Sequence, residues 1–423
     1  MFIIYDLIAL VFTVIYLPFY LLAGKFHKDF SRRFGFLPAN LNLDRPVWIH
    51  AVSVGEVNSI KGLVENLRKI YPQKKIVIST VTATGNKVAK SLVKEGDFLT
   101  YLPLDFSFII GRVLKKINPC VFIIAETEIW PNLINCLYKE KIPVVTVNGR
   151  ISDSSYKGYS MIKYLIRPIL NKITKFCVQT DIDALRLQKL GVLESKIEVT
   201  GNVKFDIKPE ENPKANTAVY RRKLWLTEND KLLVCGSTHS KEEEIIFNSY
   251  KELLISLPEL KLLVAPRHPE RTQDIAKLAE QFGFMPIFIS TLTEACPTCT
   301  NKPVFVLDTI GELFNYYSAS DVVFMGGSLV KKGGHNIIEP ASLKKPVIFG
   351  PYMFNFRQIC KLFLENKAGI MVSSGRDLVI KTKQILSNNL FEKAIAERAY
   401  ELIAKNKGAT VKNIKAIEQV VKI

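Results

Sequence analysis

The feature that most constrains the fold is an alternation of short, almost wholly apolar runs with longer amphipathic segments. In the first half of the chain the apolar runs fall at residues 47–54, 76–81, 98–102, 121–125, 144–148, 176–179 and 197–200. Segments with helical periodicity, such as 56–70 and 85–95, lie between them. Continuous apolar strands separated by helices are typical of a parallel sheet that is covered on both faces. The first half is therefore predicted to be a doubly wound α/β domain.

The same alternation restarts after a polar interval at residues 208–214. The second series of apolar runs falls at residues 232–235, 260–265, 286–289, 304–307, 322–325 and 347–349. The last stretch, 390–423, has a helical pattern and is expected to pack back on the first domain. A chain of 423 residues is also too long for one ordinary core. We therefore predict two Rossmann-like domains, 25–208 and 209–423, which face each other across a cleft in the architecture called GT-B.

The N-terminus carries a separate signal. Residues 2–23 are almost wholly apolar or aromatic, with Asp6 as the only charge, and a run of this length can span a bilayer. It lacks the basic start and the small-residue cleavage site of a signal peptide. Basic residues follow it directly, and the positive-inside rule then places the rest of the chain in the cytoplasm. We predict a membrane-anchoring helix over residues 1–24, which either crosses the membrane or lies in its interface.

The net charge and the cysteines limit the classes of partner and metal that the protein is expected to bind. Lys plus Arg (58) exceed Asp plus Glu (40), and the net charge of +18 favours anionic partners. Because no dense basic run or nucleic-acid motif is present, we expect a membrane surface or a phosphorylated substrate and no nucleic acid. The pair Cys296 and Cys299 has metal or redox spacing but no second pair, and the histidines are not at ligand spacing. We predict no metal and no cofactor.

In a doubly wound fold, ligands bind beyond the carboxyl ends of the strands. The first apolar run is followed by Glu56, which opens a helix, directly after Gly55. An acid at this position either stabilises the helix N-terminus or acts as a general base for an acceptor hydroxyl, and the residues leave both open. The run at 121–125 is followed by Glu126, Glu128, Trp130 and Asn132, a grouping that favours a sugar-binding site.

The second half carries groups suited to anions. Gly236-Ser-Thr-His239 precedes an acidic helix start, and such a small-residue turn is a ready anion site. Arg267 and His268 lie in a basic cluster after the next strand, where Arg can hold phosphate. The glycine-rich stretch 324–340 ends in His-Asn and Glu339, and we interpret it as a nucleotide cradle in which Glu339 grips a ribose. It is neither a GxGxxG fingerprint nor a P-loop, which disfavours dehydrogenases and kinases.

Taken in this order, the segments resemble the 3-deoxy-D-manno-octulosonic acid (Kdo) transferases of lipopolysaccharide biosynthesis. The similarity runs nearly end to end. Its motifs are the apolar N-terminus, Val54-Gly55-Glu56, the Glu126 to Asn132 segment, Asn148-Gly149-Arg150, Gly201-Asn202-Val203-Lys204, Gly236-Ser-Thr-His239, Pro266-Arg-His-Pro-Glu-Arg271 and the glycine cradle. Members of the family commonly have Asn-Ala-Arg where this chain has Asn-Gly-Arg.

The resemblance implies an inverting, metal-independent glycosyltransferase at the cytoplasmic face of the inner membrane. The first domain would bind the anionic lipid A precursor (lipid IVA) as acceptor, and the second would bind the donor, CMP-Kdo. Glu56 would be the base that deprotonates the acceptor, and Glu126 and Lys204 would stabilise the transition state. The residues implied for nucleotide binding are Arg267, His268, Ile310, Gly311, Glu312, Asn336, Ile337, Ile338 and Glu339.

One physical argument opposes the role of Glu56 as a general base. The positive end of a helix favours ionised Glu56, which would make it a weak base unless acceptor binding and domain closure desolvate it. Two other functions stay open from the residues alone. One is a different GT-B enzyme, such as a nucleotide-sugar epimerase or a transferase that uses a UDP-sugar. The other is a non-catalytic membrane protein whose basic surface recruits acidic lipids.

Overall fold

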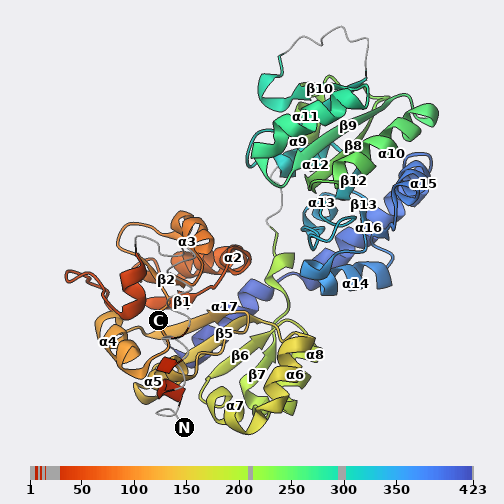
Figure 1. The fold of residues 1–423 in the computed structure, drawn as a ribbon. Helices are drawn as coiled ribbons and strands as arrows, with labels where there is room; N and C mark the ends of the chain where they lie inside the picture. The colour runs from red at the N-terminus through yellow and green to blue at the C-terminus, as the bar shows by residue number, and fades with distance from the viewer. Residues whose placement is uncertain are drawn as a thin grey trace. The chain divides into compact units, whose positions relative to one another are not determined.

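The computed structural model describes residues 5–7, 10, 11, 15, 29–207, 213–293 and 302–421. The chain divides into two compact units (Figure 1), the first formed by Met1–Asp206 with Asn406–Ile423 and the second by Ile207–Lys405. The predicted boundary between residues 208 and 209 falls in a segment outside the described residues, as does the pair Cys296 and Cys299. Residues 406–423, which the sequence boundary grouped with the second domain, belong to the first unit.

The described part of the first unit is built on a seven-stranded parallel sheet in the order β3-β2-β1-β4-β5-β6-β7. Its strands are β1 (Val47–His50), β2 (Ile76–Thr80), β3 (Phe98–Tyr101), β4 (Val121–Ala125), β5 (Val144–Gly149), β6 (Lys175–Val178) and β7 (Ile197–Val199). β1 pairs with β2 on one side and β4 on the other, with Val47 opposite both Ile76 and Val121. The strand order therefore reverses between β1 and β4, which is where doubly wound folds bind ligands.

Helices cover both faces of this sheet because alternate residues of each strand point to opposite sides. The helices are α2 (Val54–Ile70), α3 (Ala83–Ala89), α4 (Ser107–Ile117), α5 (Pro131–Lys139), α6 (Asp153–Met161), α7 (Lys163–Leu170), α8 (Asp181–Lys189) and α17 (Ala409–Val420). Trp48 and Phe122 face a core shared with α4, α5 and α7. Ile49 and Ile123 face the opposite core, where α17 adds Ile414 beside side chains of α2.

The described part of the second unit repeats the plan, with seven parallel strands in the order β10-β11-β9-β8-β12-β13-β14. Its strands are β8 (Lys231–Thr238), β9 (Leu260–Pro266), β10 (Met285–Phe288), β11 (Pro303–Val306), β12 (Val322–Met325), β13 (Val347–Phe349) and β14 (Ile370–Met371). Its helices are α9 (Pro213–Lys223), α10 (Glu242–Ser256), α11 (Thr272–Gln281), α12 (Leu313–Ala319), α13 (Ile338–Ser342), α14 (Arg357–Glu365), α15 (Gly375–Leu386) and α16 (Asn389–Asn406). The prediction of two Rossmann-like parallel-sheet domains is thus confirmed.

Two local predictions differ from the structure. The first strand ends at His50, and α2 begins at Val54, two residues before the position expected from Glu56. β8 continues through Thr238, so residues 236–238 form the end of a strand and not a small-residue turn. The turn lies at 239–241, because Lys241 takes the left-handed conformation just before α10 begins. The anion site predicted at the 236–238 turn is therefore wrong in its local geometry.

Among the described residues, no helix is both long and apolar enough to cross a membrane. Most of the apolar run at 2–23, and with it most of the predicted anchor, lies outside the residues that the structure describes. The anchor therefore stays a prediction.

The buried His50 predicts a loss of stability in mild acid. His50 is fully buried at the end of β1, with Nδ1 3.0 Å from the Ser79 carbonyl oxygen. Burial, with a smaller effect from the nearby charge of Arg33, lowers its pKa to about 4, although the hydrogen bond to the Ser79 backbone acts in the opposite direction. The unfolded state therefore takes up a proton as the pH falls below about 6.5 while the native state does not. The stabilisation from neutral His50 is fully present above that pH and is lost progressively down to about pH 4.

We expect His50 to account for about 2 kcal/mol of the unfolding free energy lost between pH 7 and pH 5. Urea unfolding of wild type and His50→Asn at both pH values measures this, and the variant should show the smaller loss. His268→Asn is the matched control, since that side chain is 55% exposed. Equal losses in wild type and His50→Asn would contradict the assignment.

Candidate active site

Glu56 lies in the first turn of α2, beyond the carboxyl end of β1. Its Oε2 accepts a hydrogen bond from the Val52 amide at 2.7 Å, and its Oε1 accepts one from the Ser53 hydroxyl at 3.1 Å. Partial burial, together with smaller effects from the charges of Glu126 and Glu128, nevertheless raises its pKa to about 7. Desolvation therefore outweighs both hydrogen bonds. Glu56 is poised as a base near neutral pH.

Glu126 and Lys204 meet near Glu56. Glu126 follows β4 in a left-handed conformation (φ +58°), which is strained for a residue with a side chain, and its amide donates to the Val147 carbonyl at 2.9 Å. Partial burial lowers the pKa of Lys204, while the charge of Glu126 acts in the opposite direction. Because Glu126 influences the ionisation of both Glu56 and Lys204, the three predicted catalytic residues form one cluster.

Two further charged residues belong to this cluster: Glu128, which was predicted only as part of a sugar-binding site, and Arg150, for which no role was predicted. Burial and the charge of Glu126 raise the pKa of Glu128. Arg150, directly after β5, acts on Lys204 and lowers its pKa. The Arg150 amide donates to the Thr127 hydroxyl at 3.0 Å, which ties the loops after β4 and β5 together. Both residues stand in motifs already visible in the sequence, but their proximity depends on the strand order.

The position of Lys204 is fixed by a polar network. Lys204 lies in a short 3-10 helix, η4 (Val203–Phe205), whose first amide donates to the Asn148 side chain at 3.2 Å. The Lys204 amide donates to Asn202 Oδ1 at 3.0 Å. At the other end of η4, Asp206 accepts hydrogen bonds from the Gly408 and Thr410 amides, at 2.6 and 2.5 Å. The N-terminus of α17 therefore helps to hold the lysine segment.

The other residues of the predicted sugar-binding site, Trp130 and Asn132, have structural roles. Asn132 is fully buried, and its amide group donates to the Asp105 carbonyl oxygen at 2.7 Å. Trp130 packs against the core of the first unit, with its ring centroid 6.5 Å from that of His50. The predicted sugar-binding site therefore contains residues with two different roles. Its acids belong to the cluster with Glu56, while Trp130 and Asn132 support the start of α5.

In the second unit, Arg267 and three histidines gather beyond β8, β9 and β12. Nε2 of His239 lies 3.0 Å from Nε2 of His335, and their rings stack with centroids 5.3 Å apart. One ring must donate its N–H to the other, so the accepting ring is neutral. Burial, followed by nearby cations that include Arg267, lowers the pKa of both to about 4. His268 approaches the pair, with its ring centroid 5.8 Å from that of His239.

The Arg267 guanidinium has no hydrogen-bond partner among the residues that the structure describes, and its side chain is exposed. Its charge lowers the pKa of Glu339, although burial has the larger effect and raises it. Glu339 accepts a hydrogen bond from the Asn336 side chain at 3.1 Å. Arg267 and Asn336 thus both act on Glu339, and His268 follows Arg267 directly in the chain. An unpaired guanidinium beside neutral histidines is suited to a phosphate.

Other members of the predicted nucleotide set are placed differently. Ile337 and Ile338 are fully buried side chains, so only their backbone is available to a ligand. Ile310 and Gly311 are exposed after β11, and the Glu312 carboxylate lies 4.0 Å from Lys223 and also accepts from Thr309. This loop shares the carboxyl edge of the sheet, but no contact in the described structure joins it to Arg267.

The glycine loop after β12 is organised by Glu242, which the sequence did not single out. This carboxylate is fully buried, and it accepts hydrogen bonds from the amides of Gly327, Ser328 and Leu329 at 2.6, 3.0 and 2.9 Å. Gly326 allows the loop to approach β8, since a Cβ there would lie 2.5 Å from the Ser237 carbonyl oxygen. The amides of 327–329 therefore bind the protein's own carboxylate, and Gly326 serves close packing of the loop against β8.

Glu242→Gln is expected to destabilise the second unit by about 2–4 kcal/mol. The carboxylate accepts four backbone amides, because the His239 amide also donates to it at 3.3 Å. The oxygen of Gln can satisfy two of these donors, and its NH2 then faces the other two, which leaves buried polar groups unpaired. Glu244→Gln is the matched control, since Glu244 is an exposed residue in the same helical turn. Chemical unfolding measures the difference. A Glu242→Gln protein as stable as the control would contradict this role.

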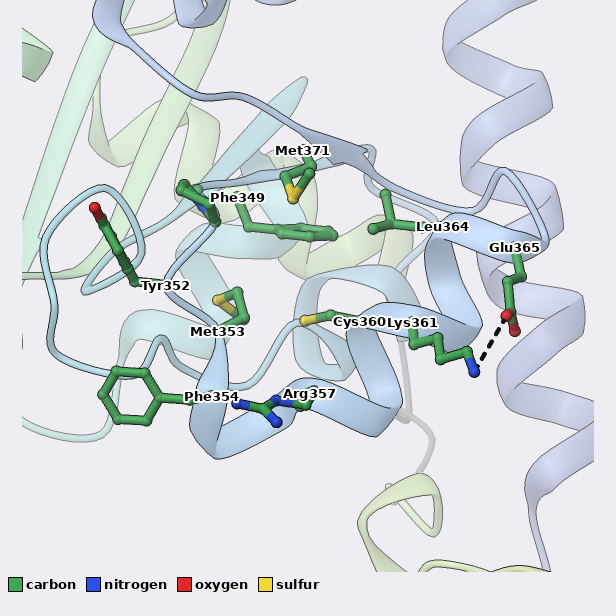
Figure 2. A pocket seen from close by; sticks show the side chains of 12 residues that line it. Phe349, Tyr352, Met353, Phe354, Arg357, Cys360, Lys361, Leu364, Glu365 and Met371 are labelled. Atoms are coloured by element: carbon green, nitrogen blue, oxygen red, sulfur yellow. Dashed lines mark ion pairs between the residues drawn. The ribbon is translucent and has the colours of Figure 1, made fainter. Parts of the chain in front are cut away.

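Beside the glycine loop lies a mainly apolar pocket of about 440 Å³ at the carboxyl end of β13 (Figure 2). Phe349, Met353, Cys360 and Leu364 line it, and Lys361 pairs with Glu365 at its edge at 3.7 Å. The loop after β13 forms one wall and is joined to the glycine loop by the Tyr352 amide, which donates to the Ser328 carbonyl at 2.9 Å. None of the predicted site residues lines this pocket.

Comparison with known proteins agrees with this architecture and these motifs. The fold is similar to that of UDP-GlcNAc 2-epimerase from Neisseria meningitidis, with a TM-score of 0.58 and 15% identity over 88% of this chain and 100% of that one. Residues 28–207 match the family described as 3-deoxy-D-manno-octulosonic-acid transferase (kdotransferase). The 3-deoxy-D-manno-octulosonic acid transferase of Haemophilus influenzae is 36% identical over 388 residues, which cover 91% of this chain and 90% of that protein.

A second relative, the bifunctional glycosyltransferase/methyltransferase of Fusobacterium nucleatum, is 36% identical over 89% of this chain and 58% of its own length. The protein is a glycosyltransferase with two Rossmann-like domains. It belongs to the 3-deoxy-D-manno-octulosonic acid (Kdo) transferase family, as the sequence motifs predicted.

Proposed function

We propose that the protein transfers Kdo from CMP-Kdo to a hydroxyl of the anionic lipid A precursor, with inversion at the anomeric carbon. The acceptor oxygen forms the new bond to that carbon while the bond from carbon to the phosphate oxygen breaks. The electron pair of the broken bond leaves with CMP, and the acceptor proton passes to Glu56. The single observation that carries this proposal is the cluster of Glu56, Glu126 and Lys204 at the switch point of the first sheet.

The cluster supplies the groups that such a displacement needs. A carboxylate with a pKa of about 7 is ionised in a large fraction of molecules at neutral pH, yet is basic enough to take a hydroxyl proton. Lys204 supplies a positive charge for the leaving phosphate or the sugar carboxylate, and Glu126 opposes the positive charge that develops on the sugar ring. The half-buried setting strengthens each interaction relative to water.

For the donor, we propose that Arg267 binds the CMP phosphate, supported by His268 and the neutral pair of His239 and His335. The carboxylate of Glu339 is suited to the ribose hydroxyls, as the sequence suggested. The Ile310-Gly311-Glu312 loop and the backbone of Ile337 and Ile338 are proposed to complete the nucleotide site.

The site of action that we propose is the cytoplasmic face of the inner membrane, since the lipid acceptor resides in a bilayer. The apolar run at 2–23 and the net charge of +18 support this location.

Competition between nucleotides tests the donor assignment. The detergent-solubilised full-length protein should bind CMP by titration calorimetry, and an excess of UDP should not displace it. Displacement by UDP at equal concentration would favour a transferase or epimerase that uses a UDP-sugar. Absence of CMP binding by the folded protein would overturn the proposed donor.

A further inference from the structure

The Asp206 carboxylate joins the two segments of chain that connect the first unit to the second. On the outward path Asp206 is the last residue of the first unit, and on the return path Asn406 is the first. Asp206 accepts hydrogen bonds from the Gly408 amide through Oδ1, at 2.6 Å, and from the Thr410 amide through Oδ2, at 2.5 Å. The outward chain is therefore bonded to the N-terminus of α17, which closes the sequence but belongs to the first unit (Figure 1).

This connection acts on the short helix η4, which carries Lys204. Lys204 and Asp206 are two residues apart in one turn, in which the Asp206 amide donates to the Val203 carbonyl at 3.1 Å. Phe205 lies between them and is buried. A 3-10 helix of this length has little stability of its own, because its hydrogen bonds are few and poorly aligned. The surrounding fold must therefore determine where the lysine side chain begins.

A second route from α17 reaches the other end of η4. The side chain of Asn413 is fully buried, accepts a hydrogen bond from the Asn148 amide at 3.4 Å and donates to the Ala409 carbonyl at 2.7 Å. The Asn148 side chain in turn accepts a hydrogen bond from the Val203 amide at 3.2 Å. Helix α17 thus holds η4 on both sides of Lys204, through Asn148 before the lysine and through Asp206 after it.

The proposed role of Lys204 requires such support. A cation stabilises a transition state most when its position is fixed before the reaction begins. A displacement of about 1 Å can lower the rate about 10²-fold. Burial lowers the pKa of Lys204, and the charge of Glu126 acts in the opposite direction. The position of the ammonium relative to that carboxylate therefore also governs the charge of the lysine.

We propose that Asp206 is a positioning residue of the transfer reaction. By binding the N-terminus of α17, it fixes the backbone of η4 so that Lys204 reaches the cluster with Glu56 and Glu126. Asp206 acts through Lys204 and not on the reacting atoms, and the C-terminal helix becomes part of the catalytic apparatus of the first unit. The inference rests on the proposed function and deepens it, since it names what holds the catalytic lysine in place.

The same hydrogen bonds also stabilise α17, because an acid at a helix N-terminus is favourable. A double-mutant cycle with Lys204 distinguishes positioning from stabilisation. In the otherwise wild-type, full-length enzyme, Asp206→Ala should lower kcat about 10–100-fold and leave the KM for the donor and the Kd for CMP unchanged. In the Lys204→Met enzyme the same substitution should lower kcat less than about twofold, because no ammonium is left to misplace.

Equal losses of kcat in the two backgrounds would show that Asp206 only stabilises the fold, and would overturn the inference while leaving the proposed reaction intact. An unchanged kcat of Asp206→Ala in the wild-type background would overturn it as well. A wild-type kcat in Lys204→Met alone would instead contradict the proposed role of Lys204, and the inference would fail with it.

Asp97→Ala is the matched control. The Asp97 carboxylate also accepts two backbone amides within the first unit, from Ile76 and Lys94, both at 2.8 Å. These bonds lie where β2 and β3 begin, and not beyond the carboxyl ends of the strands. Asp97→Ala should therefore lower the melting temperature and keep the wild-type kcat. A loss of kcat as large as that of Asp206→Ala would assign both effects to reduced stability and contradict the proposal.

Asp206→Asn extends the test to a variant that keeps the shape of the side chain. Its remaining oxygen can accept one of the two amides, while its NH2 faces the other. Its kcat should therefore lie between those of the wild type and Asp206→Ala, and the loss should again require Lys204. A loss that persists unchanged in the Lys204→Met background would overturn the inference even if Asp206→Ala did not fold.

Discussion

Glu56→Gln is expected to lower the rate constant of sugar transfer by about 10²–10⁴-fold while leaving CMP affinity unchanged, because Gln cannot accept the proton of the acceptor hydroxyl. The fold should persist, since the side-chain oxygen of Gln can still accept the Val52 amide that Glu56 accepts at 2.7 Å. Glu95→Gln, a change at an exposed carboxylate of the same unit, is the matched control and should transfer at the wild-type rate. Wild-type turnover by Glu56→Gln would exclude this residue as the base.

The pKa of Glu56 also predicts how the rate of turnover depends on pH. Partial burial raises the pKa of Glu56 to about 7 in the absence of substrate, and the base must be ionised to act. The rate should therefore be constant well above pH 7 and fall about tenfold for each unit below it, with the midpoint near pH 7. The residual activity of Glu56→Gln should lack this acidic limb.

The second large effect is expected for Lys204→Met, which should lower the rate constant about 10²–10³-fold. The variant keeps most of the side-chain volume but removes the cation that the charge of Glu126 helps to keep protonated despite burial. The surrounding network should survive, because Asn148 and Asn202 hold this segment through backbone amides.

Lys189→Met, at an exposed lysine on α8, is the matched control for Lys204→Met. Steady-state kinetics at varied concentrations of the donor distinguish a role of Lys204 in the transition state from a role in donor binding. A fall in kcat indicates that Lys204 acts in the transition state. A higher KM with an unchanged kcat would show that it only binds the donor, which would contradict the proposed role.

The strands could be predicted because they are buried on both faces, so their sequences are almost continuously apolar. β4 and β12 have the predicted bounds, whereas β14 has only two residues, Ile370 and Met371, and gives no periodic signal. Position relative to strand ends also identified Glu56 and Arg267 as candidates. The sequence could not say how far the pKa of Glu56 is raised, because that depends on how deeply the fold buries it and on the acids that β4 brings beside it.

What the sequence missed arises from contacts between distant segments. Glu242 lies 85 residues before Gly327, the first amide of the glycine loop that it binds, so its control of this loop leaves no local pattern. The pairing of His239 with His335 likewise depends on β8 lying next to β12. Asn132 was predicted to belong to a sugar-binding site, but it supports the start of α5. A polar residue that follows a strand can hold the first turn of a helix as readily as it can bind a ligand.

The most direct test of the central claim is transfer from CMP-Kdo to lipid A precursor by the detergent-solubilised protein, followed by mass spectrometry of the lipid and run beside Glu56→Gln. The proposal predicts that the wild type adds the mass of one or more Kdo residues and that the folded, CMP-binding variant yields little or no product within the same time. A folded wild-type protein that binds CMP but leaves the lipid mass unchanged would contradict the proposed reaction.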